Sequence, residues 1–141
     1  MRFVLDASVA LRWLIEEEQQ ENAELVLTRL LANPELFAVP ELFSYEVFSV
    51  LHRLHPRAGF AYEEIILPIL AGGILRYPMT PEIARKAGRY LPLGLTGYDA
   101  CYAAVAEELQ ARWLTFDEKA HRLLADREIS VNLWKALPEG W

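Results

Sequence analysis

The strongest constraint on the fold is the alternation of short apolar runs with longer amphipathic segments. The runs have the length of buried strands, and the segments have the hydrophobic periodicity of helices. Strands are predicted at 2–6, 36–39, 74–77, 112–116 and 129–133. Helices are predicted at 8–17, 20–32, 41–54, 62–71, 81–90, 98–111 and 118–125. This alternation predicts an α/β fold with a mainly parallel central sheet and helices on both faces.

The length of 141 residues predicts a single domain, 1–141, with a sizeable core. No apolar run approaches the ~18 residues of a membrane span. Asp6 and Arg12 interrupt any signal-peptide core. The lone cysteine, Cys101, permits no intrachain disulfide. We therefore expect a cytoplasmic protein with no membrane partner.

Four carboxylates stand where the pattern points inward or to the end of a strand: Asp6, Glu46, Asp99 and Asp117. Asp6 ends the first predicted strand, and Asp117 follows the fourth. Glu46 and Asp99 lie in, or at the start of, helices that such strands feed. Because sites in parallel sheets gather beyond the carboxyl ends of the strands, we expect the fold to bring the four acids to one edge.

Three of these acids also have a structural interpretation as helix caps. Asp6 and Asp117 each precede a predicted helix, where a carboxylate accepts hydrogen bonds from free backbone N–H groups. Asp99 follows Thr96 by three residues, as in a capping box. Taken singly, these positions do not require a functional role.

Glu46 is harder to explain as a structural residue. Leu42 and Val50 lie one turn before and one turn after it on the same helix face. The nearest base on that face, Arg53, is two turns away. Burial without a partner raises the pKa of a carboxyl group or costs several kcal/mol, and a bound cation would remove this cost.

The four acids together predict a site for a hard divalent cation. Carboxylates about 4–6 Å apart repel one another unless a cation neutralises them, and oxygen ligands favour Mg²⁺ (or Mn²⁺). Cys101 and the three histidines do not form the ligand set of a softer metal. We expect the histidines at the surface. Such a site is typical of phosphoryl transfer, and no Gly-rich phosphate loop indicates nucleoside triphosphate hydrolysis.

Four motifs, in order, carry a resemblance to a known family: VLDAS (4–8), PELFSYEV (40–47), LTGYDACYAAVAEEL (95–109) and LTFD (114–117). With them the chain resembles, over essentially its whole length, the PIN-domain ribonucleases, in particular VapC-type toxins of toxin–antitoxin pairs. The resemblance implies a three-layer α/β/α domain. It also implies a Mg²⁺- or Mn²⁺-dependent endoribonuclease that hydrolyses RNA phosphodiester bonds as the toxin of a type II pair.

Carried over by position, Asp6, Glu46, Asp99 and Asp117 match the family's acidic quartet and are the expected catalytic and metal-binding residues. Asp6 and Asp99 would be the most direct ligands. Glu46 and Asp117 would complete the set or act through water.

Three smaller residues complete this comparison. Ser8 and Thr115 match hydroxyl positions beside the first and last acids, where we expect them to orient the ligands. Ser49 is a departure, since many relatives carry Asn three residues after the middle Glu. The departure leaves the acids intact but changes a position expected to contact substrate.

The resemblance further implies a cognate antitoxin and a homodimer, with Trp13 and its neighbours as candidates for the antitoxin contact. A net charge of −6 is unusual for a nucleic-acid-binding protein. Basic residues at 52–57 or 85–89 could supply a local RNA-binding face, although solvated helix faces are the simpler interpretation of both runs. Two alternatives stay open: a PIN-like RNA-processing nuclease without an antitoxin, and an inactive PIN-like binding module, against which the intact quartet argues.

Overall fold

Five strands form the central sheet of the computed structural model, which describes residues 1–141. They are β1 (Phe3–Leu5), β2 (Phe37–Pro40), β3 (Leu75–Tyr77), β4 (Arg112–Thr115) and β5 (Ser130–Asn132). The order is β3-β2-β1-β4-β5, and every neighbouring pair is parallel. β1 is central and buried on both faces, which explains why its sequence is uniformly apolar rather than alternating.

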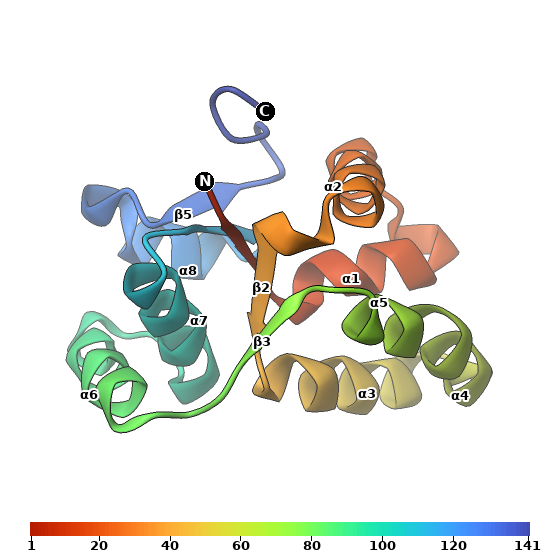
Figure 1. Ribbon diagram of the computed structural model, residues 1–141, viewed down its shortest axis with the longest axis horizontal. Coiled ribbons are helices and arrows are strands. Elements are labelled where there is room, and N and C mark those ends of the chain that lie inside the picture. Colours follow the sequence, from red (N-terminus) through yellow and green to blue (C-terminus); the bar gives the residue numbers. More distant parts are fainter.

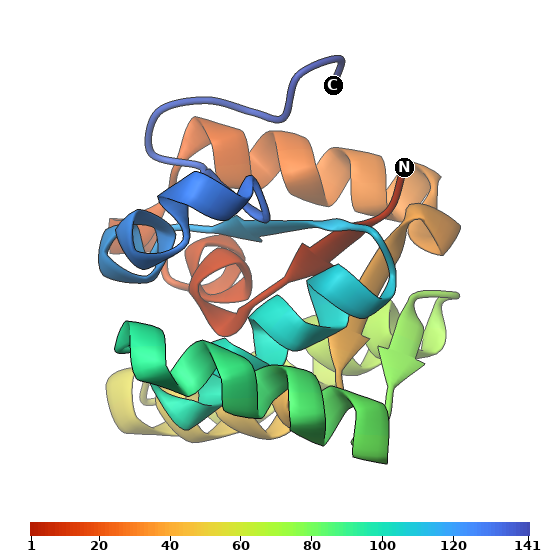
Figure 2. The same ribbon diagram turned by 90° about the vertical axis from the view of Figure 1, so that its left-hand side faces the viewer.

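Helices cover both faces of the sheet and confirm the predicted three-layer α/β/α arrangement (Figure 1). One face carries α1 (Ala7–Leu14), α2 (Glu21–Ala32), α3 (Leu42–Leu54), α4 (Ala58–Ala61) and α5 (Leu67–Ala71). The other face carries α6 (Pro81–Tyr90) and α7 (Gly97–Glu108), and α8 (Glu118–Leu123) packs beside β5. α7 contacts β1, β2 and β4, and α6 packs on its outer side (Figure 2).

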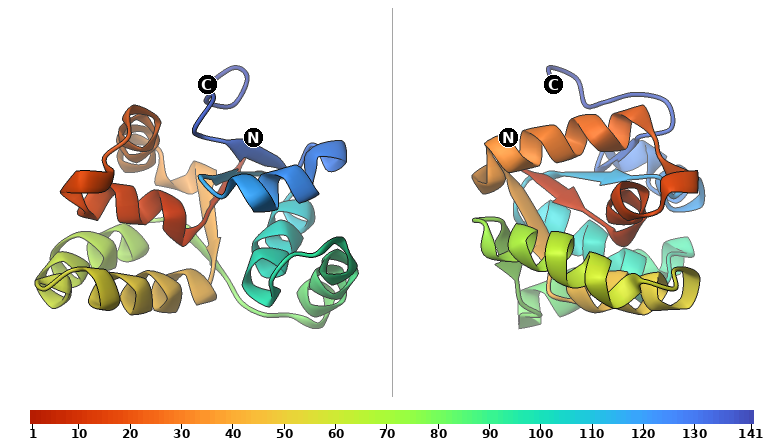
Figure 3. Two further views of the ribbon diagram at one scale, coloured as in Figure 1. Left: turned by 180° about the vertical axis from the view of Figure 1, so that it is seen from behind. Right: turned by 90° about the vertical axis from the view of Figure 1, so that its right-hand side faces the viewer.

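The chain reverses its direction across the sheet between β1 and β4. α1 follows β1 and α8 follows β4, and the two helices leave the sheet in opposite directions (Figure 3). The β1–β4 register pairs Leu5 with Leu114, so Asp6 and Thr115 come next, side by side. In open α/β sheets, ligands bind at such a switch point, beyond the carboxyl ends of the two strands.

The main difference from the predicted elements lies in 58–71. A single helix was predicted over 62–71, but the structure begins it at Ala58 and widens it into a π-helical segment, Tyr62–Ile66. Pro68 follows in the first turn of α5. A proline lacks the N–H that would bond four residues back, and its ring crowds that carbonyl. The wider π turn relieves this conflict.

Other helix ends differ by a few residues. The first helix stops at Leu14 and continues as a 3₁₀ turn, Glu16–Glu18. α7 ends at Glu108 because Gln110 adopts a left-handed backbone conformation, with φ 51°, on the way into β4. Further 3₁₀ turns span Pro34–Leu36, Leu91–Leu93 and Ala125–Arg127. None of the helices combines the length and apolar character needed to cross a membrane.

Candidate active site

Asp6 lies at the switch point and accepts four hydrogen bonds. Its Oδ1 accepts from the backbone N–H of Ser8 (3.0 Å) and from the Ser8 hydroxyl. Its Oδ2 accepts from the indole N–H of Trp113 (3.0 Å) and from the Thr115 hydroxyl. Only 4% of the residue is exposed. These donors occupy the lone-pair positions of the carboxylate and fix its orientation.

The two hydroxyls also join the ends of β1 and β4. Ser8 Oγ accepts from the N–H of Phe116, and Thr115 Oγ1 accepts from the N–H of Asp117, both at 3.0 Å. Each hydroxyl therefore donates to Asp6 and accepts from the segment after β4. The capping interpretation of Asp6 is correct as well, since it bonds the first turn of α1.

Burial makes Asp6 a weaker acid than usual. Its pKa is raised from 3.8 to about 6, mainly by burial and to a smaller extent by the negative charge of Asp99. The hydrogen bonds from Ser8, Thr115 and Trp113 act in the opposite direction because they stabilise the charged form. Burial is the largest effect.

Glu46 is half-buried in α3, as its position in the apolar stripe predicted. Burial raises its pKa from 4.5 to about 7, and the negative charges of Asp6 and Asp99 add to the increase. No salt bridge offsets this cost, since those of the structure involve α6 and α7. Glu46 is thus an acid held near other acids without a protein cation.

Asp99 and Asp117 approach from the first turn of α7 and the start of α8. Thr96 caps α7 by accepting from the N–H of Asp99 (3.1 Å). Asp117 caps α8 by accepting from the N–H of Ala120 (3.0 Å). Burial, followed by the charge of Asp117, raises the pKa of Asp99. The two acids therefore sit at helix starts and also act on one another electrostatically.

The structure brings the four acids into one electrostatic neighbourhood. Asp6 and Asp99 both act on Glu46, Asp99 acts on Asp6, and Asp117 acts on Asp99. No three of them converge into a closed ligand set in the present side-chain conformations. The all-oxygen chemistry of the four acids and the raised pKa values of Asp6, Glu46 and Asp99 fit a hard cation. For Asp6 to take part, a hydroxyl would have to turn away.

Tyr102 and Trp113 belong to this site and were not identified from the sequence. Their rings stack with centroids 5.7 Å apart and 15° between planes. The Tyr102 hydroxyl is buried and forms no hydrogen bond of ordinary geometry, but it lies near enough to Glu46 to lower the pKa of that acid. Burial and the charges of Glu46, Asp6 and Asp99 raise its pKa well above 10.0. The phenol therefore stays a neutral donor beneath the acids.

A sequence signal for both residues exists, although it is faint. Tyr102 lies three positions after Asp99, on the same side of α7. Trp113 lies two positions before Thr115, on the same face of β4.

Of the two basic runs, the one on α6 is neutralised. Arg85, Lys86 and Arg89 pair with Glu82, Glu108 and Glu107, respectively. Arg53, on α3, forms no salt bridge. Arg53 is therefore an unpaired positive charge at the end of α3, in addition to Arg12, which acts on Asp6, and Lys119, which acts on Asp99.

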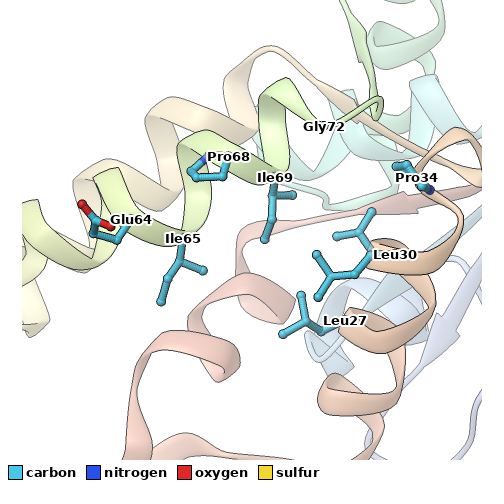
Figure 4. A pocket seen from close by; sticks show the side chains of 9 residues that line it. Leu27, Leu30, Pro34, Glu64, Ile65, Pro68, Ile69 and Gly72 are labelled. Carbon is cyan, nitrogen blue, oxygen red and sulfur yellow. The ribbon is translucent and has the colours of Figure 1, made fainter.

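An apolar groove of about 340 Å³ runs between α2 and the 62–71 segment (Figure 4). Leu27 and Leu30 from α2 face Ile65 and Ile69 across it. Leu31, at the α2 rim, is 65% exposed. None of the four acids lines the groove, so it is a surface separate from the acidic site.

Trp13, which we expect near the antitoxin contact, also has a structural role. It is half-buried between α1 and α2, where its indole N–H donates to the carbonyl of Ala23 (2.8 Å). This bond ties α1 to α2, and the antitoxin contact stays a prediction.

Known proteins of similar sequence belong to the family that the four sequence motifs resemble. The PIN domain profile matches residues 3–125. Ribonuclease VapC3 of Pyrobaculum aerophilum is 30% identical over 125 residues, which cover 84% of this chain and 92% of that protein.

Two solved structures share the fold at lower identity. FitAcB from Neisseria gonorrhoeae superposes with a TM-score of 0.72 at 20% identity, covering 95% of this chain and 99% of that one. A chain of a toxin–antitoxin complex from Klebsiella pneumoniae superposes with a TM-score of 0.65 at 15% identity. The superposition covers 92% of this chain and 96% of that one.

Proposed function

The chain belongs to the PIN domain family, and on this basis we propose that it is a metal-dependent endoribonuclease that hydrolyses RNA phosphodiester bonds. One observation carries the proposal: Asp6 is fixed by four donors at the switch point, Asp99 is close enough to raise its pKa, and both acids are close enough to raise the pKa of Glu46. None of the four acids forms a salt bridge, and a buried cluster of carboxylates without such a partner is costly unless it binds a cation. The ribonuclease relative supports RNA as the substrate.

In this proposal Asp6, Glu46, Asp99 and Asp117 hold Mg²⁺ or Mn²⁺, which when bound lowers the pKa of a water molecule and stabilises the leaving oxygen. Ser8 and Thr115 orient Asp6 and hold the ends of β1 and β4 together. Tyr102 closes the floor of the site and excludes water from beneath the acids.

Cleavage of a mixed RNA by the purified protein tests the activity. We expect cleavage with Mg²⁺ or Mn²⁺, none after EDTA treatment, and poor activity with Zn²⁺ or Ca²⁺. Asp99→Asn should lose cleavage and keep a native circular dichroism spectrum. The matched control is Asp126→Asn, an exposed acid in a 3₁₀ turn. Cleavage that survives exhaustive chelation, or that Asp99→Asn retains, would falsify the assignment.

We further propose that the protein is the toxin of a toxin–antitoxin pair, acts as a homodimer in the cytoplasm, and binds its antitoxin through the apolar groove. The toxin–antitoxin complex among the structural neighbours supports a protein partner. The groove is apolar and open to solvent, as a binding site for an amphipathic segment should be.

Co-expression tests the partner proposal. The product of a small gene overlapping the start of this one should relieve growth arrest. Leu31→Glu should abolish the relief while RNA cleavage persists. Met79 is 62% exposed and lies outside the groove, so Met79→Glu should retain the relief of growth arrest. Relief that is absent for wild type favours the processing-nuclease alternative, and absence of cleavage altogether favours the inactive binding module.

A further inference from the structure

A hollow of about 600 Å³ lies beside the acids, between one face of α3 and the start of α7. Glu46, Ser49 and Arg53 line it at helical spacing, and Tyr45 and Tyr98 stand at its rim. Its volume lies within the range of about 300–1,000 Å³ typical of ligand sites. Because Glu46 belongs to both, the hollow is continuous with the acidic site.

Two tyrosine rings project from this hollow into solvent. Tyr45 is 76% exposed and Tyr98 is 63% exposed. Each directly precedes an acid of the site, Glu46 and Asp99. Packing does not account for their positions, since rings so exposed contribute little to the core. Exposed aromatic faces are the platforms on which unpaired bases stack.

Arg53 supplies a positive charge at the far end of the hollow. It lies seven residues after Glu46, roughly 10 Å along the helix axis. Unlike the bases of α6, it has no acidic partner. A guanidinium in this position matches a phosphate group.

Resting on the proposed function, we propose that this hollow is a binding track for single-stranded RNA. Tyr45 and Tyr98 stack on unpaired bases that flank the scissile phosphate, and Arg53 binds a neighbouring phosphate. The bases of an RNA duplex are already stacked on one another, and its grooves offer shape and hydroxyl contacts instead. The track therefore selects unpaired RNA, and Ser49 adds a hydroxyl within reach of the strand.

Binding can be measured apart from cleavage. The probe is a 12-nucleotide single-stranded RNA carrying 2-aminopurine, titrated with wild-type protein in Ca²⁺ and checked for integrity on a gel. We expect quenching of the probe on binding. Tyr98→Ala or Tyr45→Ala should weaken binding about tenfold and reduce the quenching, because stacking is lost. Tyr98→Phe, which keeps the ring, should bind within twofold of wild type.

Matched controls separate these residues from exposed residues elsewhere. Phe60→Ala removes a ring that is 67% exposed outside the hollow and should leave affinity unchanged. Arg53→Gln should reduce the slope of log affinity against log salt by about 0.7, the value for one phosphate contact on a single strand. Arg2→Gln, before β1 at the opposite edge of the sheet, should leave the slope unchanged.

The outcomes distinguish the track from the activity. If wild type cleaves RNA but both tyrosine-to-alanine variants bind the probe normally, the RNA-binding track is contradicted and the nuclease activity is still supported. If the probe binds as predicted but no RNA is cleaved under any condition, the nuclease activity is contradicted and the RNA-binding track is still supported. Equal affinity for duplex RNA would overturn the track. So would tyrosine variants that dissociate into monomers with unchanged RNA affinity, because the face would then be an interface between copies.

Discussion

The indole N–H of Trp113 donates a hydrogen bond to Asp6 Oδ2 over 3.0 Å, from the neighbouring strand and from a fully buried position. The bond stabilises the charged carboxylate and is one reason why the pKa of Asp6 does not rise above about 6. A tryptophan that sequence patterns assign to the core is thus part of the acidic site.

Trp113→Phe should destabilise the protein in a pH-dependent way. The loss of a donor to a buried carboxylate costs about 1–3 kcal/mol, and the smaller ring adds a packing cost at every pH. Because the lost bond stabilised only the charged form, the folded pKa of Asp6 rises further. The additional cost therefore appears as the pH increases through about 6.

Urea unfolding of wild type and Trp113→Phe from pH 4.5 to 8 measures this effect. Trp141→Phe, which loses aromatic packing on Phe3 but no hydrogen bond to an acid, is the control and should show a pH-independent cost. A constant difference between Trp113→Phe and wild type would contradict the role given to the indole.

Asp6→Asn and Asp99→Asn should both abolish cleavage, but their stabilities should differ. The asparagine amide at position 6 would meet the N–H of either Ser8 or Trp113, neither of which can turn to accept. The conflict should make Asp6→Asn less stable than Asp99→Asn by about 1–3 kcal/mol. The Asp99 carboxylate has no such set of donors to lose. Chemical unfolding at pH 7.5 in EDTA gives the comparison, and the reverse order would show that the donors around Asp6 do not control it.

Glu46→Gln should stabilise the metal-free protein at alkaline pH. The folded pKa of about 7 is above the ordinary 4.5, so the native state binds this proton more tightly than the unfolded state. The resulting stabilisation is complete below about pH 4.5 and is lost as the pH rises through about 7. Glutamine removes the buried charge, and after discounting for solvent screening we expect a gain of about 1 kcal/mol at pH 8.

Thermal unfolding of Glu46→Gln and wild type in EDTA at pH 5 and pH 8 tests this sign. The gain should be present at pH 8 and absent at pH 5. Glu64→Gln, an exposed acid at the rim of the apolar groove, should show no such dependence. A gain for Glu46→Gln at both pH values would mean that charge is not its cause.

Mg²⁺ should stabilise wild type and leave the asparagine variants nearly unchanged. Binding to the native state alone contributes about 2.7 kcal/mol at a concentration 100 times the dissociation constant. The measurement is the melting temperature of wild type, Asp99→Asn and Asp117→Asn across a Mg²⁺ titration. If all three proteins respond equally, the cation acts elsewhere on the molecule.

Much of the fold could be predicted because strand and helix periodicities are local properties of the chain. The strands fall within about one residue of the predicted bounds, and α6 matches 81–90 fully. The segment 58–71 could not be predicted in detail, since the effect of Pro68 depends on how the preceding turn relaxes. Periodicity alone does not separate a π-helical turn from an α-helical one.

The site could be predicted less completely, for reasons of tertiary structure. The acids were found because charge in an apolar pattern is unusual, and Glu46 is the clearest case. Trp113 was missed because its function depends on where its N–H points, which only the pairing of β1 with β4 decides. The pairing of Arg89 with Glu107, 18 residues away, likewise arises only when α6 packs on α7.

The hydrogen bonds that hold Asp6 also set an order of events during synthesis. Asp6 leaves the ribosome 107 residues before its donor Trp113 and 109 residues before its donor Thr115. Contacts of such long range form late, since the intervening chain must first be ordered. A nascent or prematurely terminated chain that lacks β4 therefore carries Asp6 without the means to position it. A fragment that ends before β4 should therefore show no cleavage, even though it contains Asp6, Glu46 and Asp99.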